Sequence, residues 1–186
     1  QIPDIVTVTV MSKHQRYFPL YEKTGKLSNK FITMANFVGT DEESFENIKK
    51  GNQRVISARL EDGKFFYDED IKTKLIEKLP ALKGMTFQRG LGTLFDKTER
   101  IEKLSSFIAD ELNISDKTDI LRAAKLSKAD LSTKLVFEFT ELQGFIGENY
   151  ALKSGEKENV ALAIKEHYFP LSANSELPSK IEGHIV

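Results

Sequence analysis

Three cations recur every third residue near the middle of the chain, at Arg122, Lys125 and Lys128, and Lys134 extends the series. Residues three or four apart are neighbours on a helix, so these side chains are expected to form a slanting basic stripe. Such a stripe can follow a phosphate backbone, although charge runs more often form a solvated face. The spacing therefore leaves phosphate contact and simple solvation as alternatives.

Two arginines form a second candidate group, Arg54 and Arg59 in the run N-Q-R-V-I-S-A-R. A guanidinium donates two parallel hydrogen bonds to a phosphate. Asp62 follows closely, so internal ion pairs are at least as probable as RNA contacts for both arginines. We predict four tRNA-contacting candidates in all: Arg54, Arg59, Lys125 and Lys128.

Acid–base and metal chemistry have few candidates. The only histidines are His14, His167 and His184, so the long stretch between the first two offers carboxylates alone. Asp130 lies at the start of the most apolar run and could be a metal ligand. A buried acid answered by a lysine or by backbone amides is the simpler interpretation, because an unpaired buried charge is costly. The sequence predicts no catalytic residue and no metal site.

The glycines Gly144 and Gly147 lie three residues apart in the same apolar region. Glycine carries no chemistry and costs roughly 1 kcal/mol inside a helix. They predict either close packing of two helices or a helix break.

Composition narrows the function classes. The 186 residues carry 27 basic and 28 acidic side chains, a net charge of −1, and no cysteine. Any RNA contact must therefore come from a local patch. No run approaches the ~20 apolar residues of a membrane span, and no signal peptide is evident, so we expect a cytoplasmic protein. The chain starts at Gln-Ile-Pro and ends in a helix-like pattern, so we expect a piece of a longer protein.

The first third is predicted to be rich in β-structure. Asp4–Met11 alternates valine and threonine, which is typical of a half-buried strand. Pro19 favours an edge strand, Lys23–Lys26 a hairpin turn, and Lys30–Phe37 a second strand.

Helical patterns follow. We predict a short helix from Asp41 that Gly51 closes, then a helix over Asn52–Phe66 that Gly63 ends, with a strand as the alternative for the second. Further helices are expected over Asp70–Leu82 and Glu156–Tyr168.

Another helix is expected to open with a capping box between Asp96 and Glu99. Ser115 or Asp116 would cap the helix after it. The buried face of the first of these two helices is expected to consist of Ile101, Leu104, Phe107, Ile108 and Leu112.

The predicted fold class is α+β. A β-rich part over residues 1–66 belongs to a truncated domain, and a mostly helical domain follows over 67–186.

Several ordered blocks carry a resemblance to a known family. They include H-Q-R-Y-F at His14–Phe18, the run Gly51–Phe66, and F-Q-R-G-L-G-T-L-F-D-K-T-E-R-I at Phe87–Ile101. Gly63 replaces the family's usual alanine. Together with F-E-F-T-E-L-Q-G-F-I-G at Phe137–Gly147, they resemble the β subunit of the bacterial-type, two-subunit glycyl-tRNA synthetase.

The resemblance implies that 67–186 is an HD-like domain, preceded by part of a domain similar to one in phenylalanyl-tRNA synthetase. It further implies a partner α subunit, in an assembly of two α and two β subunits, that uses ATP and magnesium to activate glycine. The β subunit would mainly bind tRNA, not DNA, away from membranes. The alternative is a metal-dependent phosphohydrolase of the HD type, whose His-Asp pair this chain lacks.

Overall fold

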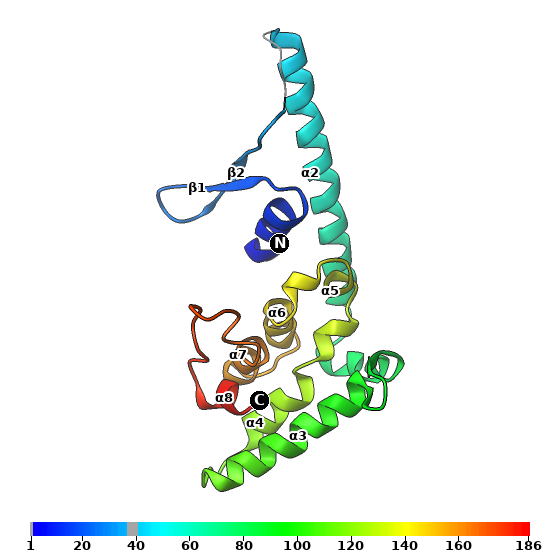
Figure 1. Ribbon diagram of the computed structural model, residues 1–186, viewed down its shortest axis with the longest axis vertical. Helices are drawn as coiled ribbons and strands as arrows, with labels where there is room; N and C mark the ends of the chain where they lie inside the picture. Colours follow the sequence, from blue (N-terminus) through cyan, green and yellow to red (C-terminus); the bar gives the residue numbers. More distant parts are fainter. Residues whose placement is uncertain (1, 37–40) are drawn as a thin grey trace. The chain divides into compact units, whose positions relative to one another are not determined.

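A computed structural model describes residues 2–36 and 41–186 (Figure 1). The chain divides into two compact units, Gln1–Asp68 and Glu69–Val186. Whether these units are the two expected domains, and whether the second is HD-like, stays a prediction. Within the described ranges, no helix combines the length and apolar character that crossing a bilayer requires.

The first unit opens with a helix where the sequence pattern predicts a strand. Helix α1 (Asp4–Thr9) continues into a π-helical turn η1 (Val10–His14), so the strand prediction for Asp4–Met11 is wrong. Pro3 stands at the N-cap in an extended conformation, and the carboxylate of Asp4 suits the first turn of a helix. Val6 and Val10 are four residues apart, a spacing that places two side chains on the same side of a strand and also on the same side of a helix. Their burial is therefore compatible with either structure.

A hairpin follows as predicted. Strands β1 (Phe18–Tyr21) and β2 (Leu27–Ile32) pair antiparallel, with a register shift between Pro19 and Tyr21. The turn between them is closed by the Glu22 N–H donating to the Lys26 carbonyl, and its Gly25 has a φ of 81°. The second strand starts and ends earlier than predicted, and Phe37 of the predicted strand lies outside the described residues.

Helix α2 (Glu42–Asp70) is continuous through Gly51 and Gly63, so the two predicted breaks are wrong. A helical glycine costs about 1 kcal/mol, which packing on either side can outweigh. Ile56 and Tyr67 on this helix are buried. Of the two alternatives for Asn52–Phe66, the helix is confirmed.

The second unit begins with 3₁₀ turns. The predicted helix over Asp70–Leu82 is replaced by the end of α2 and a 3₁₀ segment η2 (Leu75–Gly84). Short strands β3 (Thr86–Gln88) and β4 (Gly92–Thr93) then form a hairpin.

Helix α3 (Leu94–Glu111) differs from its prediction in its capping box and in the residues that it buries. Its capping box joins Thr93 with Asp96, not Asp96 with Glu99. Leu104, Phe107 and Leu112 are 57%, 60% and 54% exposed, so most of the predicted buried face is wrong.

Small side chains bury instead, because they allow neighbouring backbones to approach α3. The hydroxyl of Ser105 donates to the carbonyl of Ile185 at 3.3 Å, and Ala109 packs with Ile120 and Ile185.

The remaining helices form the rest of the second unit (Figure 1). Helix α7 (Glu158–Glu166) packs against three others, and Val160, Ala161 and Ile164 are buried, which confirms the predicted helix in this region. The N-cap of α4 is Lys117, so neither Ser115 nor Asp116 caps the helix as predicted, although Asp116 Oδ1 accepts from the Thr118 N–H one residue further in. The other elements of this part of the chain are α4 (Thr118–Leu126), η3 (Ala129–Ser132), α5 (Lys134–Glu138), η4 (Thr140–Leu142), α6 (Phe145–Lys153) and α8 (Ile181–Ile185). The α+β fold class is confirmed.

Candidate functional site

The predicted basic stripe does not form one surface. Arg122 is held by Glu156, with Nε–Oε2 and Nη2–Oε1 distances of 2.9 and 2.5 Å. The hydrogen bonds that Arg122 donates to Glu156 raise the pKa of Arg122. Because Nε and Nη2, on one edge of the guanidinium, each donate to a different oxygen of the same carboxylate, Arg122 mainly links α4 to the segment before α7.

Lys125 is exposed in the last turn of α4. It borders a shallow hollow of about 410 Å³ that also contains Leu121 and Val160. The same hollow has acidic walls from Glu102 and Asp119. Lys125 can therefore reach a solvent-borne anion, but its surroundings are of mixed charge.

Lys128 is buried, with 8% of its surface exposed. Its Nζ lies 2.6 Å from His167 Nε2 and 3.8 Å from the centroid of the Tyr168 ring. His167 Nδ1 lies 2.7 Å from the carbonyl of Ile164, so the arrangement fits an Nδ1–H donor and an Nε2 that accepts from the ammonium. Lys128 thus faces the interior, while Lys125 faces solvent.

The titration of this pair follows from its burial. Burial, with the nearby charge of Lys97, lowers the pKa of Lys128 to about 8. Burial and the ammonium of Lys128 lower the pKa of His167 to about 3. At neutral pH the imidazole is therefore neutral and the ammonium is mostly charged.

Asp130 is completely buried beside this pair. Its Oδ2 accepts a 2.6 Å hydrogen bond from the Gly144 N–H, whereas its Oδ1 has no hydrogen-bond partner among the described residues. Burial raises its pKa to about 6, opposed by the Gly144 bond and by Lys128. The prediction of a buried acid is confirmed, and of the two predicted kinds of partner it is a backbone amide, that of Gly144, that makes the hydrogen bond.

The two glycines of this region allow the close contacts. Gly144 has a φ of 78° and precedes α6, and an added Cβ would lie 2.7 Å from the Tyr168 ring. An added Cβ at Gly147 would lie 2.8 Å from Ile164 Cγ2 and 2.9 Å from Asp130 Oδ2. Close packing is confirmed at Gly147, and Gly144 marks the start of the helix.

A second buried carboxylate, Asp70, was missed by sequence reasoning. Its oxygens accept from the N–H groups of Lys134 and Leu135 at 3.1 and 2.9 Å, and from the Tyr150 hydroxyl at 3.1 Å. Asp70 thereby ties the end of α2 to the start of α5 and to α6. These partners lie 64 to 80 residues away in sequence, so no local pattern reports them.

Arg54 and Arg59 are exposed on α2 in the first unit. Five residues correspond to about 140° around a helix, so the two side chains leave it in different directions. They are two separate candidate contacts.

The described residues contain no group of three or more His, Cys, Asp or Glu side chains placed to hold a metal ion. Of the four predicted contacts, Arg54, Arg59 and Lys125 are exposed, whereas Lys128 is buried.

Comparison with known proteins identifies the family. The family described as "Glycyl-tRNA synthetase beta subunit" matches residues 1–186. The chain belongs to this family. The resemblance stated from the sequence motifs is thus confirmed over the whole chain.

Curated relatives agree with this family. The chain is 42% identical over 188 residues to the "Glycine--tRNA ligase beta subunit" of Listeria monocytogenes serotype 4b (strain CLIP80459), covering 100% of this chain and 27% of the relative. It is 44% identical over 187 residues to that of Streptococcus agalactiae serotype Ia, again covering 100% and 27%. For the Clostridioides difficile (strain 630) protein, the identity is 50% over 184 residues, covering 98% and 26%. The chain therefore spans about a quarter of the length of these relatives. These matches favour a synthetase subunit over the alternative of an HD-type phosphohydrolase.

Proposed function

We propose that this chain is a tRNA-binding and subunit-assembly segment of a glycine–tRNA ligase β subunit and is itself non-catalytic. The observation that carries the proposal is the 42–50% identity to glycine–tRNA ligase β subunits over nearly the whole chain. In the complete enzyme, two β subunits join two α subunits in the cytoplasm. The α subunits use ATP and magnesium to activate glycine, and the β subunits hold the tRNA.

We assign the phosphate contacts to the three exposed cations, Arg54, Arg59 and Lys125. Phosphate contacts fix the position of an RNA without reading its sequence, which suits exposed cations that are not grouped around a base-reading pocket. Lys128, the fourth candidate, would reach a phosphate only after the His167–Tyr168 turn moved, because the ring of Tyr168 lies against its ammonium. Lys128 instead contributes to the packing of the segment's interior.

A pair of lysine variants tests the phosphate assignment. Lys125→Ala in the full-length β subunit, assembled with α, should weaken tRNA binding and lower the slope of log K against log[salt] by about 1. Lys153→Ala is the matched control, because Lys153 is also exposed and also lies in the last turn of its helix. Equal binding and equal salt slopes for the two variants would contradict a phosphate contact at Lys125.

A second assay separates tRNA binding from glycine activation. Arg54→Ala and Lys125→Ala should raise the KM for tRNA in the charging reaction. Glycine-dependent pyrophosphate exchange, which needs no tRNA, should remain near the wild-type rate. A parallel loss of both reactions would indicate a role on the α-subunit side instead.

A further inference from the structure

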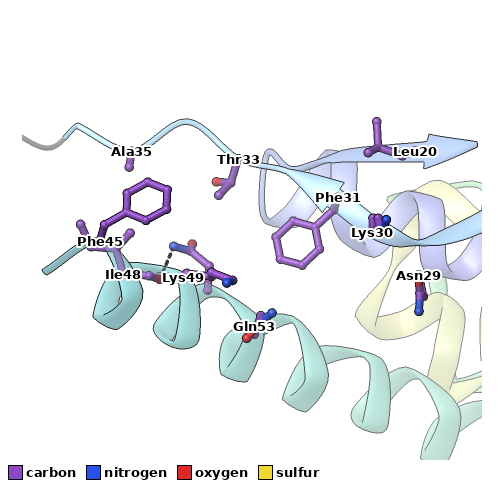
Figure 2. Close-up of a pocket in the computed structure, with 11 residues that line it drawn as sticks. Leu20, Asn29, Lys30, Phe31, Thr33, Ala35, Phe45, Ile48, Lys49 and Gln53 are labelled. Carbon is purple, nitrogen blue, oxygen red and sulfur yellow. Dashed lines mark hydrogen bonds between the residues drawn. The ribbon is translucent and has the colours of Figure 1, made fainter. Parts of the chain in front are cut away.

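The first unit contains a partly apolar pocket between the hairpin and the N-terminal part of α2 (Figure 2). Its volume is about 410 Å³, within the usual range of roughly 300–1,000 Å³ for small-ligand sites. The rings of Phe31 from β2 and Phe45 from α2 both project into it (Figure 2). The pocket therefore offers two aromatic surfaces from separate elements.

One of these rings is held in place before any ligand arrives. Phe31 stacks on Tyr17, with ring centroids 4.9 Å apart and an angle of 12° between the planes. The Tyr17 hydroxyl donates to Asn52 Oδ1 at 2.6 Å, and Asn52 Nδ2 donates to the Ile48 carbonyl at 2.9 Å. This chain of contacts fixes Phe31 to α2, so little side-chain entropy remains to be lost when a ligand binds.

The polar groups around the rings fit an anionic ligand with hydrogen-bonding edges. Lys30 and Lys49 border the pocket, and among the described residues that line it there is no aspartate or glutamate. Lys49 already meets Glu46 Oε1 at 2.9 Å, so Lys30 is the better phosphate contact. The amides of Asn29 and Gln53 also lie on the lining.

We infer that this pocket takes an unpaired nucleobase of the bound tRNA, which stacks on Phe45 beside Phe31 while its phosphate meets Lys30. Aromatic faces with adjacent cations are the means by which proteins hold single-stranded RNA, and the stacking is tolerant of base identity. The inference rests on the proposed tRNA-binding function and adds a base contact to the phosphate contacts proposed above. The competing occupant is a segment of the remainder of the β subunit, since the relatives are much longer than this chain.

The test uses the full-length β subunit assembled with α, and tRNA for glycine probed with dimethyl sulfate. Phe45→Ala removes one stacking surface, and because Phe45 is 60% exposed the fold should tolerate the change. Phe18→Ala is the matched control, because Phe18 is 57% exposed in the same unit but does not line the pocket. Phe45→Tyr keeps the ring.

The expected result is specific to the ring at position 45. Wild type, Phe45→Tyr and Phe18→Ala should protect one unpaired base from methylation, while Phe45→Ala should leave it reactive and bind tRNA about tenfold more weakly. Lys30→Ala should weaken binding and reduce its salt slope, whereas Lys23→Ala in the hairpin turn should change neither.

Three outcomes would overturn the inference, and they differ from failure of the proposed function. Protection unchanged in Phe45→Ala would exclude a base in the pocket. A lower melting temperature of the β subunit in Phe45→Ala, with the protected base retained, would assign the pocket to a protein segment. If Arg54→Ala and Lys125→Ala weaken binding but Phe45→Ala does not, only the pocket assignment fails. If none of the three changes binding, the tRNA-binding function fails as well.

Discussion

Replacement of Asp130 by asparagine should change how the stability of the fold depends on pH. The carboxylate is completely buried, accepts one hydrogen bond from Gly144, and has one oxygen without a partner among the described residues. Asparagine keeps an acceptor for the Gly144 N–H and removes the titrating charge. The variant therefore separates the hydrogen bond from the ionisation.

The magnitude follows from the raised pKa. Burial raises the pKa of Asp130 from its ordinary 3.8 to about 6 in the folded state. Between these values the folded state keeps the proton and the unfolded state releases it, so the stability contributed by this group falls as pH rises through the window. At 1.36 kcal/mol per pH unit, the loss amounts to about 3 kcal/mol.

The measurement is urea unfolding, followed by circular dichroism, of wild type and Asp130→Asn from pH 3 to pH 7, a range that includes the ordinary aspartate pKa of 3.8. The free energy of unfolding of wild type minus that of the variant should decrease by about 3 kcal/mol across this range. His167, whose pKa is lowered to about 3, contributes in the opposite sense, and the subtraction removes most of its contribution. The titration stops at pH 7, below the pKa of about 8 for Lys128.

Asp116→Asn is the control with the opposite sign. Hydrogen bonds from Thr118 lower the pKa of Asp116, so wild type should gain stability relative to this variant as pH rises. A difference for Asp130 that also rises with pH would mean that Gly144 and Lys128 outweigh burial. A flat difference would mean that water reaches the carboxylate.

The remaining predictions concern packing and helix capping, and urea unfolding measures both. Gly147→Ala should destabilise the fold, because overpacking against Ile164 costs about 1–3 kcal/mol and outweighs a helix-propensity gain of about 1 kcal/mol. Gly51→Ala, whose new methyl group meets nothing within 4 Å, should instead stabilise by up to about 1 kcal/mol; equal effects of the two would refute the packing argument. Thr93→Ala removes the capping interactions with Asp96 and should cost about 0.5–2 kcal/mol, whereas Thr93→Ser should restore most of it.

Sequence reasoning succeeded where one local signal dominates. The hairpin was predicted from Pro19 and the Lys23–Lys26 turn, because proline and glycine restrict the backbone by themselves. The burial of Asp130 was predicted from its place at the start of an apolar run, since a charge there needs a partner.

Sequence reasoning failed where the local pattern fits two structures and the packing of the fold decides between them. A run of valine and threonine fits either period, and the contacts of Val6 and Val10 decide for a helix. Gly51 and Gly63 each disfavour a helix only slightly, and the 29-residue helix α2 continues through both. On α3 the large apolar side chains suggested the buried face, but Ser105 and Ala109 lie there because small residues let neighbouring helices approach.

The candidate tRNA contacts show the same limit. The spacing of Arg122, Lys125 and Lys128 predicts one group of cations. In the structure, Arg122 instead binds the carboxylate of Glu156, and the ammonium of Lys128 lies against the ring of Tyr168. Their partners lie 34 and 39 residues or more along the chain, outside any helical window. Only Lys125 of the three remains exposed.

Charge pairing inside the second unit limits how this segment can contribute to RNA binding. Several of its cations already meet carboxylates at 2.8–2.9 Å, in the pairs Lys117–Asp110, Lys157–Asp119 and Lys165–Glu148. A cation that is paired in this way neutralises a phosphate only by giving up its carboxylate, so it releases fewer counterions on binding. With a net charge of −1 over the whole chain, the segment cannot attract tRNA through bulk charge. Any contact with tRNA must therefore come from a few positioned groups, and for that reason individual variants such as Lys125→Ala and Phe45→Ala are sharper tests of the proposed function than removal of the segment.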